Sequence, residues 1–138
     1  MIDVTKKVLN PEDIIAKVKS DGSGCVVSYV GLIRDQSNGK PVLCVEYTDI
    51  TGNAKDQLNV IANEAGRMWH LENVAISHRI GKLMVGEINI VIAVATAHRS
   101  EGFAACQYVI DQFKQRLPTS KTETYRDSTL LLREVSQD

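Results

Sequence analysis

The sequence contains few cysteines and no long hydrophobic run, and each shortage excludes a class of protein. Its three cysteines, none in a Cys-x-x-Cys pair, are too few for a disulfide framework and do not indicate a zinc site. Each of them (Cys25, Cys44 and Cys106) lies among apolar residues, which favours a buried, reduced thiol over a catalytic one. The longest apolar run, 88–97, has about ten residues, too few to span a bilayer. We therefore expect neither a membrane protein nor a metal centre.

An excess of charge of one sign is also absent. The formal net charge of the 138 residues is −1, which argues against a general nucleic-acid binder. Residues 1–7 lack the apolar segment of a signal peptide, so the cytoplasm is the expected location. With this length and 43% hydrophobic residues, we expect one globular domain over residues 1–138.

The hydrophobic patterns predict elements in the order β-α-β-β-α-β-β-α-β. Helices are predicted after the Asn10-Pro11 start signal, over 54–70, and between Ser100 and Leu117. Strands are predicted over 2–9, 25–33, 42–47, 74–83, 88–97 and 129–134, with 25–33 as a central strand buried on both faces. This order indicates an α+β fold in which the helices pack on a mostly antiparallel sheet.

The most informative stretch runs from Ala97 to Lys121. It begins where an apolar strand ends, and its apolar stripe (Phe103, Cys106, Ile110, Phe113 and Leu117) predicts a helix that Pro118 terminates. His98 and Arg99 lie at the helix start, where unpaired N–H groups favour an anion. Lys114 and Lys121 lie at its far end. This arrangement predicts a site for a negatively charged small molecule.

Single cations in this sequence leave two interpretations open. Arg34 follows the apolar run 25–33, so it is either a binding group at a strand end or a solvated charge. Lys114 is either a functional amine or a side chain whose stem covers the edge of the core. His78 and Arg79 fall on opposite faces of a predicted strand, which favours a structural or surface role.

Distance along the helix predicts a homodimer. The 14 residues from Ser100 to Lys114 correspond to roughly 21 Å of helix, too far for one small ligand to contact both ends. If both ends serve one site, two copies of the chain must share it across a symmetry axis.

Four segments of the chain resemble the MoaE family, the large catalytic subunits of molybdopterin synthases. The segments are 28–35 (Ser-Tyr-Val-Gly-Leu-Ile-Arg-Asp), 78–83 (His-Arg-Ile-Gly-Lys-Leu), 97–100 (Ala-His-Arg-Ser), and the helix end 114–118 with 121–123 (Lys-Thr-Glu). Their spacing and order agree over nearly the whole chain. The resemblance implies an α/β-hammerhead fold and a homodimer at the centre of a heterotetramer.

The resemblance also implies a reaction and its partners. A small ubiquitin-like subunit docks at each end of the homodimer and inserts a C-terminal Gly-Gly thiocarboxylate. Its sulfur is transferred to cyclic pyranopterin monophosphate, which yields the dithiolene of molybdopterin. Because the sulfur comes from the partner, no reactive cysteine and no cofactor are expected.

Carried over by motif, the site residues are two lysines and their neighbours. Lys114 and Lys121 correspond to the active-site lysines of the family. The residues implied to bind substrate alongside them are Leu32, Ile33, Arg34, His98, Arg99, Thr122, Glu123 and Arg133, the last contributed across the dimer. Arginines and a helix N-terminus suit the phosphate of the pterin, and a lysine can act as general acid/base or transiently as a nucleophile.

A non-catalytic protein is the alternative. The family commonly has an aromatic residue before its second lysine and a basic residue after it, where this chain has Ser120 and Thr122. These departures are compatible with a dimeric module that binds an anionic metabolite or a partner's tail without chemistry. A scaffold that binds only the tail would tolerate the loss of Arg34 and His98.

Overall fold

The computed structural model describes residues 1–127 and, for the backbone alone, 130–133. Within these residues the helices are α1 (Pro11–Val18), α2 (Ala54–Met68) and α3 (Arg99–Gln115). The strands are β1 (Ile2–Thr5), β2 (Cys25–Leu32), β3 (Gln36–Ser37), β4 (Lys40–Thr48), β5 (Asn73–Arg79), β6 (Gly81–Met84), β7 (Ile88–Thr96), β8 (Ser120–Tyr125) and β9 (Leu130–Arg133).

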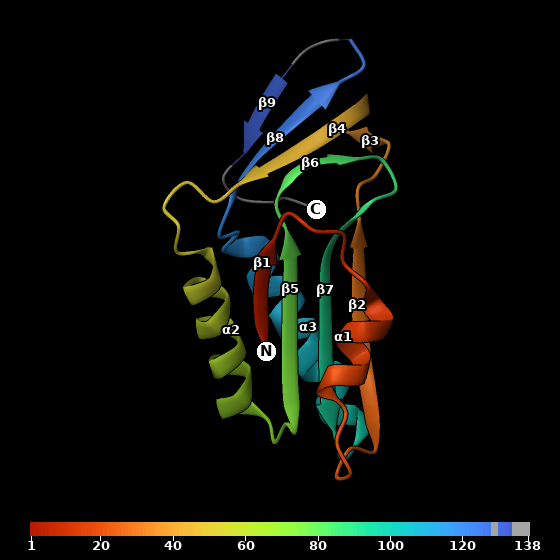
Figure 1. The fold of residues 1–138 in the computed structure, drawn as a ribbon, viewed down its shortest axis with the longest axis vertical. Coiled ribbons are helices and arrows are strands. Elements are labelled where there is room, and N and C mark those ends of the chain that lie inside the picture. The colour runs from red at the N-terminus through yellow and green to blue at the C-terminus, as the bar shows by residue number, and fades with distance from the viewer. Residues whose placement is uncertain (128–129, 134–138) are drawn as a thin grey trace.

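The first sheet carries helices on both faces. Its strand order is β1-β5-β7-β2, and only the β1–β5 pair is parallel. In Figure 1, α1 lies in front of this sheet, and α3 lies behind it with α2 at its side. β7 is buried from Ile90 onward because its alternate residues enter two cores. Ile90, Ile92 and Val94 pack toward α2 and α3, and the residues between them pack toward α1.

The second sheet lies across one end of the first (Figure 1). It runs β3-β4-β8-β9, with β6 paired to β4, and every pair is antiparallel. Asn38 and Gly39 both have positive φ and form the tight turn between β3 and β4. The prediction of an α+β protein with helices on mostly antiparallel strands is confirmed.

Two strand predictions are wrong. The run 74–83 is two strands, because Gly81 takes a φ of +92° and directs the chain from β5 in the first sheet into β6 in the second. The run 25–33 is not central: β2 is an edge strand with Val30 38% and Leu32 56% exposed. A continuous apolar run does not distinguish a buried strand from an edge strand whose exposed side chains are apolar.

The helix boundaries follow their capping signals. The side chain of Asn10 accepts hydrogen bonds from the N–H groups of Glu12 and Asp13, as the start signal predicts. α3 ends at Gln115, before Pro118. One member of its predicted stripe is misplaced, since Phe103 is 62% exposed. The helix instead turns Gly102 to the sheet, where an added Cβ would lie 2.9 Å from Thr96 Oγ1.

Candidate active site

One pocket lies where the two sheets meet the C-terminal half of α3. It contains about 600 Å³ of space between protein atoms, with open solvent at its mouth included. Its charged lining residues are Arg34, Lys114, Lys121 and Glu123. The rest of the lining is Tyr29, Gly31, Leu32, Ile33, Gln36, Ser37, Val42, Val45, Tyr47, Asn89, Ile90, Phe113 and Leu117. The pocket lining therefore carries three cations and one carboxylate, and its other residues are uncharged.

A β-bulge shapes the wall formed by β2 and β7. Gly31 pairs with Ile90 and Leu32 pairs with Ile88, so Asn89 is left without a ladder partner. Bulged residues point in directions that a regular strand does not allow, and Asn89 lines the pocket. Gly31 is required here, because a Cβ on it would lie 2.7 Å from Ile90 Cγ2 and 2.8 Å from Asn89 Oδ1.

The two lysines reach the pocket from different elements. Lys114 lies in the last turn of α3, next to the buried Phe113. Lys121 lies on β8 and is only 7% exposed, and Glu123, on the same face of the strand, is 2% exposed. Such burial of two charged side chains is typical of functional sites and costly elsewhere.

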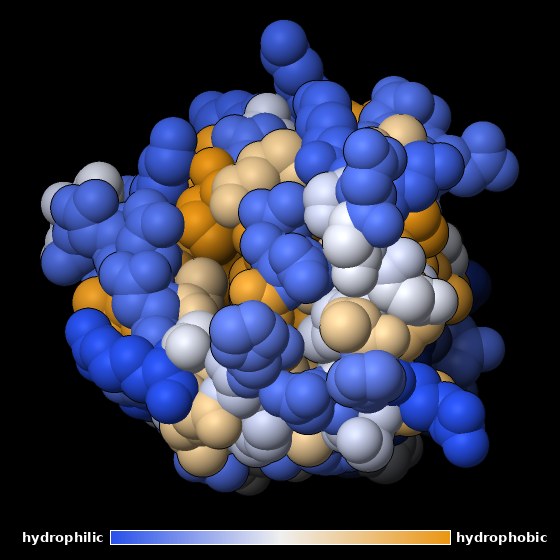
Figure 2. Space-filling model, turned by 90° about the horizontal axis from the view of Figure 1, so that it is seen from below, coloured by the Kyte–Doolittle hydropathy of each residue, from blue (hydrophilic) through white to orange (hydrophobic). Residues whose placement is uncertain are grey.

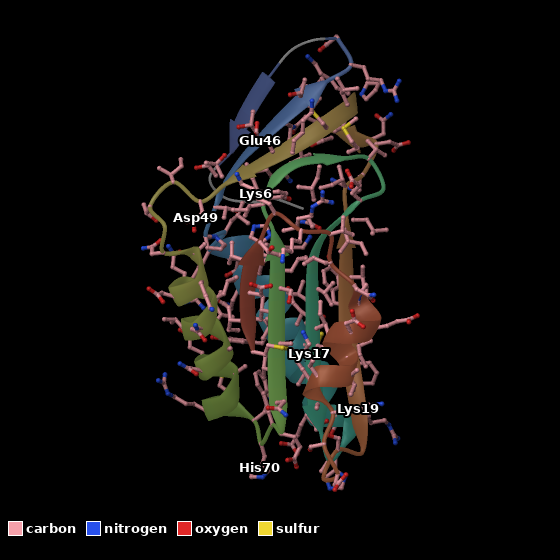
Figure 3. All side chains as sticks on the ribbon, in the orientation of Figure 1. Lys6, Lys17, Lys19, Glu46, Asp49 and His70 are labelled. Carbon is pink, nitrogen blue, oxygen red and sulfur yellow. The ribbon has the colours of Figure 1, made fainter. Side chains whose placement is uncertain are left out.

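Thr122 does not line the pocket, because strand residues alternate between the two faces. It pairs in register with Glu46 of β4, whose exposed side chain is labelled in Figure 3. The departure from the family pattern at Thr122 therefore lies outside the pocket and leaves the pocket's charge unchanged.

Buried side chains form a layer behind the pocket. Asn89 Nδ2 donates a 3.0 Å hydrogen bond to the hydroxyl of Tyr47. His78, which is fully buried, contacts both the main chain of Asn89 and the hydroxyl of Thr119 at 2.9 Å. Burial lowers the pKa of His78 to about 4, so the imidazole is neutral near pH 7. Arg79 forms an ion pair with Glu87 at 2.8 Å.

His98 and Arg99 lie at the opposite end of α3 from the pocket. α3 has 17 residues, about 25 Å of helix, and they stand at its start while Lys114 stands near its end. Both residues are exposed, and neither lines the pocket of its own chain. The surface at this end of the molecule is mostly hydrophilic, with apolar side chains visible between the polar ones (Figure 2). The structure therefore brings together Leu32, Ile33, Arg34, Lys114, Lys121 and Glu123, and leaves His98, Arg99 and Thr122 outside.

The position of Arg133 is defined by its backbone. In the β8–β9 ladder it pairs with Lys121 of its own chain. Its side chain lies outside the part of the chain that the structure describes.

Sequence reasoning missed Tyr47 and Asn89, two of the uncharged residues that line the pocket. Their signal is weak, since a tyrosine in a strand and an asparagine within an apolar run are ordinary. Cys44 and Cys106 are buried as expected, whereas Cys25 is half-buried. None of the three lines the pocket, and burial raises the pKa of Cys106 to about 11. Among the described residues no group of His, Cys, Asp and Glu is arranged to hold a metal ion, and no helix is long and apolar enough to cross a membrane.

Two mostly antiparallel sheets with three helices define an α+β protein, and its pocket is lined by two lysines, an arginine and a glutamate among uncharged residues. The family model "MoaE protein" matches residues 4–116. The chain belongs to this family, the catalytic subunits of molybdopterin synthase in molybdenum cofactor biosynthesis.

Individual relatives agree over most of the chain. A molybdopterin synthase catalytic subunit of Nostoc sp. is 39% identical over 91% of this chain and 77% of its own. That of Thermoplasma volcanium is 34% identical over 88% of this chain and 89% of its own. The crystal structure of molybdopterin synthase from Staphylococcus aureus superposes with a TM-score of 0.87 at 26% identity, covering 94% of both chains.

Proposed function

We propose that this chain transfers sulfur from the thiocarboxylated C-terminus of a small ubiquitin-like subunit to cyclic pyranopterin monophosphate. The observation that carries the proposal is the placement of Lys114 and Lys121 in one pocket with Arg34. Both reactants are anions, and a pocket with three cations and one carboxylate favours their binding side by side.

The lysines have the chemistry that the reaction needs. The acyl carbon of the thiocarboxylate must be polarised, and protons must move at the side chain of the pterin as sulfur is added. A lysine amine can donate and accept protons, and it can also attack an acyl carbon. Lys114 and Lys121 are the amines in the pocket, whereas the exposed Lys17 and Lys19 lie at the end of α1, far from the second sheet (Figure 3).

The pocket's open mouth suits a partner that inserts an extended tail. Leu32 lines it and is 56% exposed, which offers an apolar contact to such a tail. We infer that the partner is the small sulfur-carrier subunit implied by the family resemblance and that the complex works in the cytoplasm.

We further propose that two copies of the chain complete each site. His98 and Arg99 are about 22–24 Å along the helix from Lys114 in one chain, so they can serve that pocket only from a second copy. The exposed edge of β2 is a surface on which a second copy of the chain can pair. Two β2 strands paired antiparallel about a two-fold axis place the end of one strand beside the start of the other.

This pairing brings the separated residues together. Gly24, just before β2, donates a hydrogen bond to the carbonyl of Thr96, two residues before His98. The start of β2 and the start of α3 are therefore neighbours, whereas Arg34 follows the end of β2. A second copy on the β2 edge places its His98 and Arg99 toward Arg34 of the first.

Phe103 provides the test of this interface. It lies in the first turns of α3, it is 62% exposed, and α3 packs on β2. We expect Phe103→Asp to convert a dimer into a folded monomer, as measured by sedimentation, because a charge is costly in a buried interface. Val60→Asp is the matched control, since Val60 is an exposed apolar residue on α2 (51%) and should leave the dimer intact. A dimeric Phe103→Asp protein would exclude this interface.

The function itself is tested by reconstitution. The chain is mixed with a thiocarboxylated small subunit and cyclic pyranopterin monophosphate, and the dithiolene product is measured. Formation of dithiolene supports the enzyme. Tight binding of both ligands without product would instead establish the non-catalytic module.

A further inference from the structure

One buried imidazole, that of His78, joins the segments that build the pocket. His78 lies on β5 behind the pocket and does not line it. It is 0% exposed, and both of its ring nitrogens have hydrogen-bond partners at 2.9 Å. A buried polar ring that is fully satisfied holds its neighbours in one arrangement, since any shift breaks a bond that water cannot replace.

The partners of His78 determine its tautomer. A carbonyl oxygen only accepts hydrogen bonds, so Nδ1 carries the proton and donates it to the main-chain oxygen of Asn89. Nε2 of the neutral ring is then an acceptor, and the hydroxyl of Thr119 must donate to it. The low pKa of His78, near 4, keeps the ring neutral and preserves this pattern near pH 7.

Each hydrogen bond of His78 is made to a segment that forms a wall of the pocket. The carbonyl of Asn89 belongs to the bulged residue of β7, which the ladder leaves unpaired, and the side chain of Asn89 lines the pocket. Thr119 is 3% exposed and lies two residues before Lys121, immediately before β8 begins at Ser120. His78 therefore connects the bulge in the first sheet with the lysine-bearing strand of the second.

The ring of His78 also contacts two aromatic side chains from the other two walls of the pocket. Tyr47 of β4 packs edge-on against His78 with ring centroids 4.9 Å apart, and Phe113 of α3 does so at 5.0 Å. Both aromatic rings line the pocket, and Phe113 is adjacent to Lys114. Four separate segments that carry pocket residues thus contact a single side chain.

We propose that His78 is a positioning residue for the sulfur transfer proposed above: through Thr119, Asn89 and Phe113 it fixes Lys121 in relation to Lys114 across the pocket. It acts through these neighbours and does not contact the reactants. Its role would be to keep the two amines at a constant separation while substrate enters, because small misplacements of catalytic groups are costly.

The test removes the hydrogen bond between Thr119 and His78. Thr119→Val keeps the shape of the side chain and removes the hydroxyl, whereas Thr119→Ser keeps the hydroxyl. The first readout needs no substrate: acetylation of Lys121 by acetic anhydride, measured by mass spectrometry relative to the exposed Lys17. We expect Thr119→Val to change this ratio by about threefold or more and Thr119→Ser to leave it within about twofold, as a positioning role requires.

The second readout is dithiolene formation by the dimer with its small subunit. Thr119→Val is expected to lower kcat about tenfold or more with little change in KM, and Thr119→Ser to restore kcat. His78→Asn is the second variant. Its amide can still donate toward Asn89 but is too short to accept from Thr119, so it should behave like Thr119→Val. Val18→Ala, in the separate core beneath α1, controls for lost stability and should change neither readout.

The outcomes separate this inference from the proposed function. If the unmodified protein forms no dithiolene, the proposed function fails, and the acetylation of Lys121 still tests the positioning role. If either Thr119→Val or His78→Asn folds, as judged by circular dichroism, and Lys121 reacts as in the unmodified protein, the positioning role of His78 is overturned.

Discussion

Asn89 of β7 donates a hydrogen bond of 3.0 Å to the hydroxyl of Tyr47 in β4, and this contact joins the two sheets at the floor of the pocket. Neither strand pairs with the other, so the contact depends on two side chains rather than on a ladder. Because Asn89 is the bulged residue of β7, its side chain can leave the regular alternation and meet Tyr47. The pocket therefore depends on an irregularity in the first sheet.

Replacing Lys114 by alanine should abolish sulfur transfer and preserve the fold. We expect a loss of about 10²–10⁴-fold in kcat, the usual contribution of a positioned acid or base. Dithiolene formation gives the rate, and a thermal melt monitors the fold. Lys17→Ala is the matched control, because Lys17 also lies in the last turn of its helix. Near-normal turnover of Lys114→Ala would remove this lysine from the mechanism.

Arg34→Ala should weaken pterin binding with little effect on the fold. Loss of a charged hydrogen bond to the phosphate costs about 1.5–3 kcal/mol. This corresponds to a roughly 10- to 150-fold rise in Kd, measurable by calorimetry. Arg99→Ala should act similarly in the dimer, whereas Arg67→Ala on the exposed side of α2 should not. Unchanged affinity in both Arg34→Ala and Arg99→Ala would place the phosphate elsewhere.

A mixed dimer tests whether two chains share a site. A chain with Arg99→Ala is combined with a chain with Lys114→Ala and assayed at a pterin concentration well below the raised Kd of the Arg99→Ala homodimer, where neither homodimer turns over appreciably. If Arg99 serves the pocket of its partner, one of the two pockets contains both intact residues, and about half of the normal activity returns. If every chain builds its own site, each pocket contains one lesion and the heterodimer stays inactive, which would refute the shared site.

Acidification should destabilise the protein through His78. The folded pKa is about 4 and the unfolded value is 6.5, so the unfolded chain binds the proton first. The free energy of unfolding is unaffected above pH 6.5 and falls by about 3 kcal/mol as the pH drops from 6.5 to 4. Urea denaturation across this range measures the slope. His78→Gln should flatten the profile, and His70→Gln, at an exposed position, should reproduce the original curve.

Gly31→Ala should damage the pocket wall. The added Cβ would lie 2.7 Å from Ile90 and 2.8 Å from Asn89, so β2 or the bulge must move. We expect a loss of about 1–3 kcal/mol in stability, as in overpacked cores, together with weaker pterin binding. Gly66→Ala is the control, since nothing lies within 4 Å of a Cβ there and helix propensity favours alanine. An unfolding free energy equal to that of the unmodified protein would contradict the need for glycine at position 31.

The sequence predicts those parts of the fold and site that depend on local signals. The Asn10 cap and the end of the third helix before Pro118 are local, and both are confirmed. Arg34 and Lys114 were identifiable as charges next to apolar residues, Lys121 was identifiable from its match to the family motif, and the three share a pocket. What these residues do chemically remains a prediction.

Features that depend on distant contacts were not predictable. The assignment of 25–33 to a central strand failed because strand order is a property of the sheet and not of the strand. Phe103 fits the apolar period of its helix, but at this end of the helix it is Gly102 that approaches the sheet at Thr96, and Phe103 is exposed to solvent. The bulge at Asn89 needs the register of β2 against β7, which no local pattern reveals.

The strand pairing of the second sheet also determines when the site can form during synthesis. β4 pairs with β8, so the ladder between residues 42–48 and residues 120–125 cannot form until residues 120–125 have been synthesised. A ribosome delivers Arg34 early and Lys121 late, and contacts so distant in sequence close slowly. A nascent chain therefore lacks the pocket residues Lys121 and Glu123 until residues 120–125 have been added, and the cavity is complete only then.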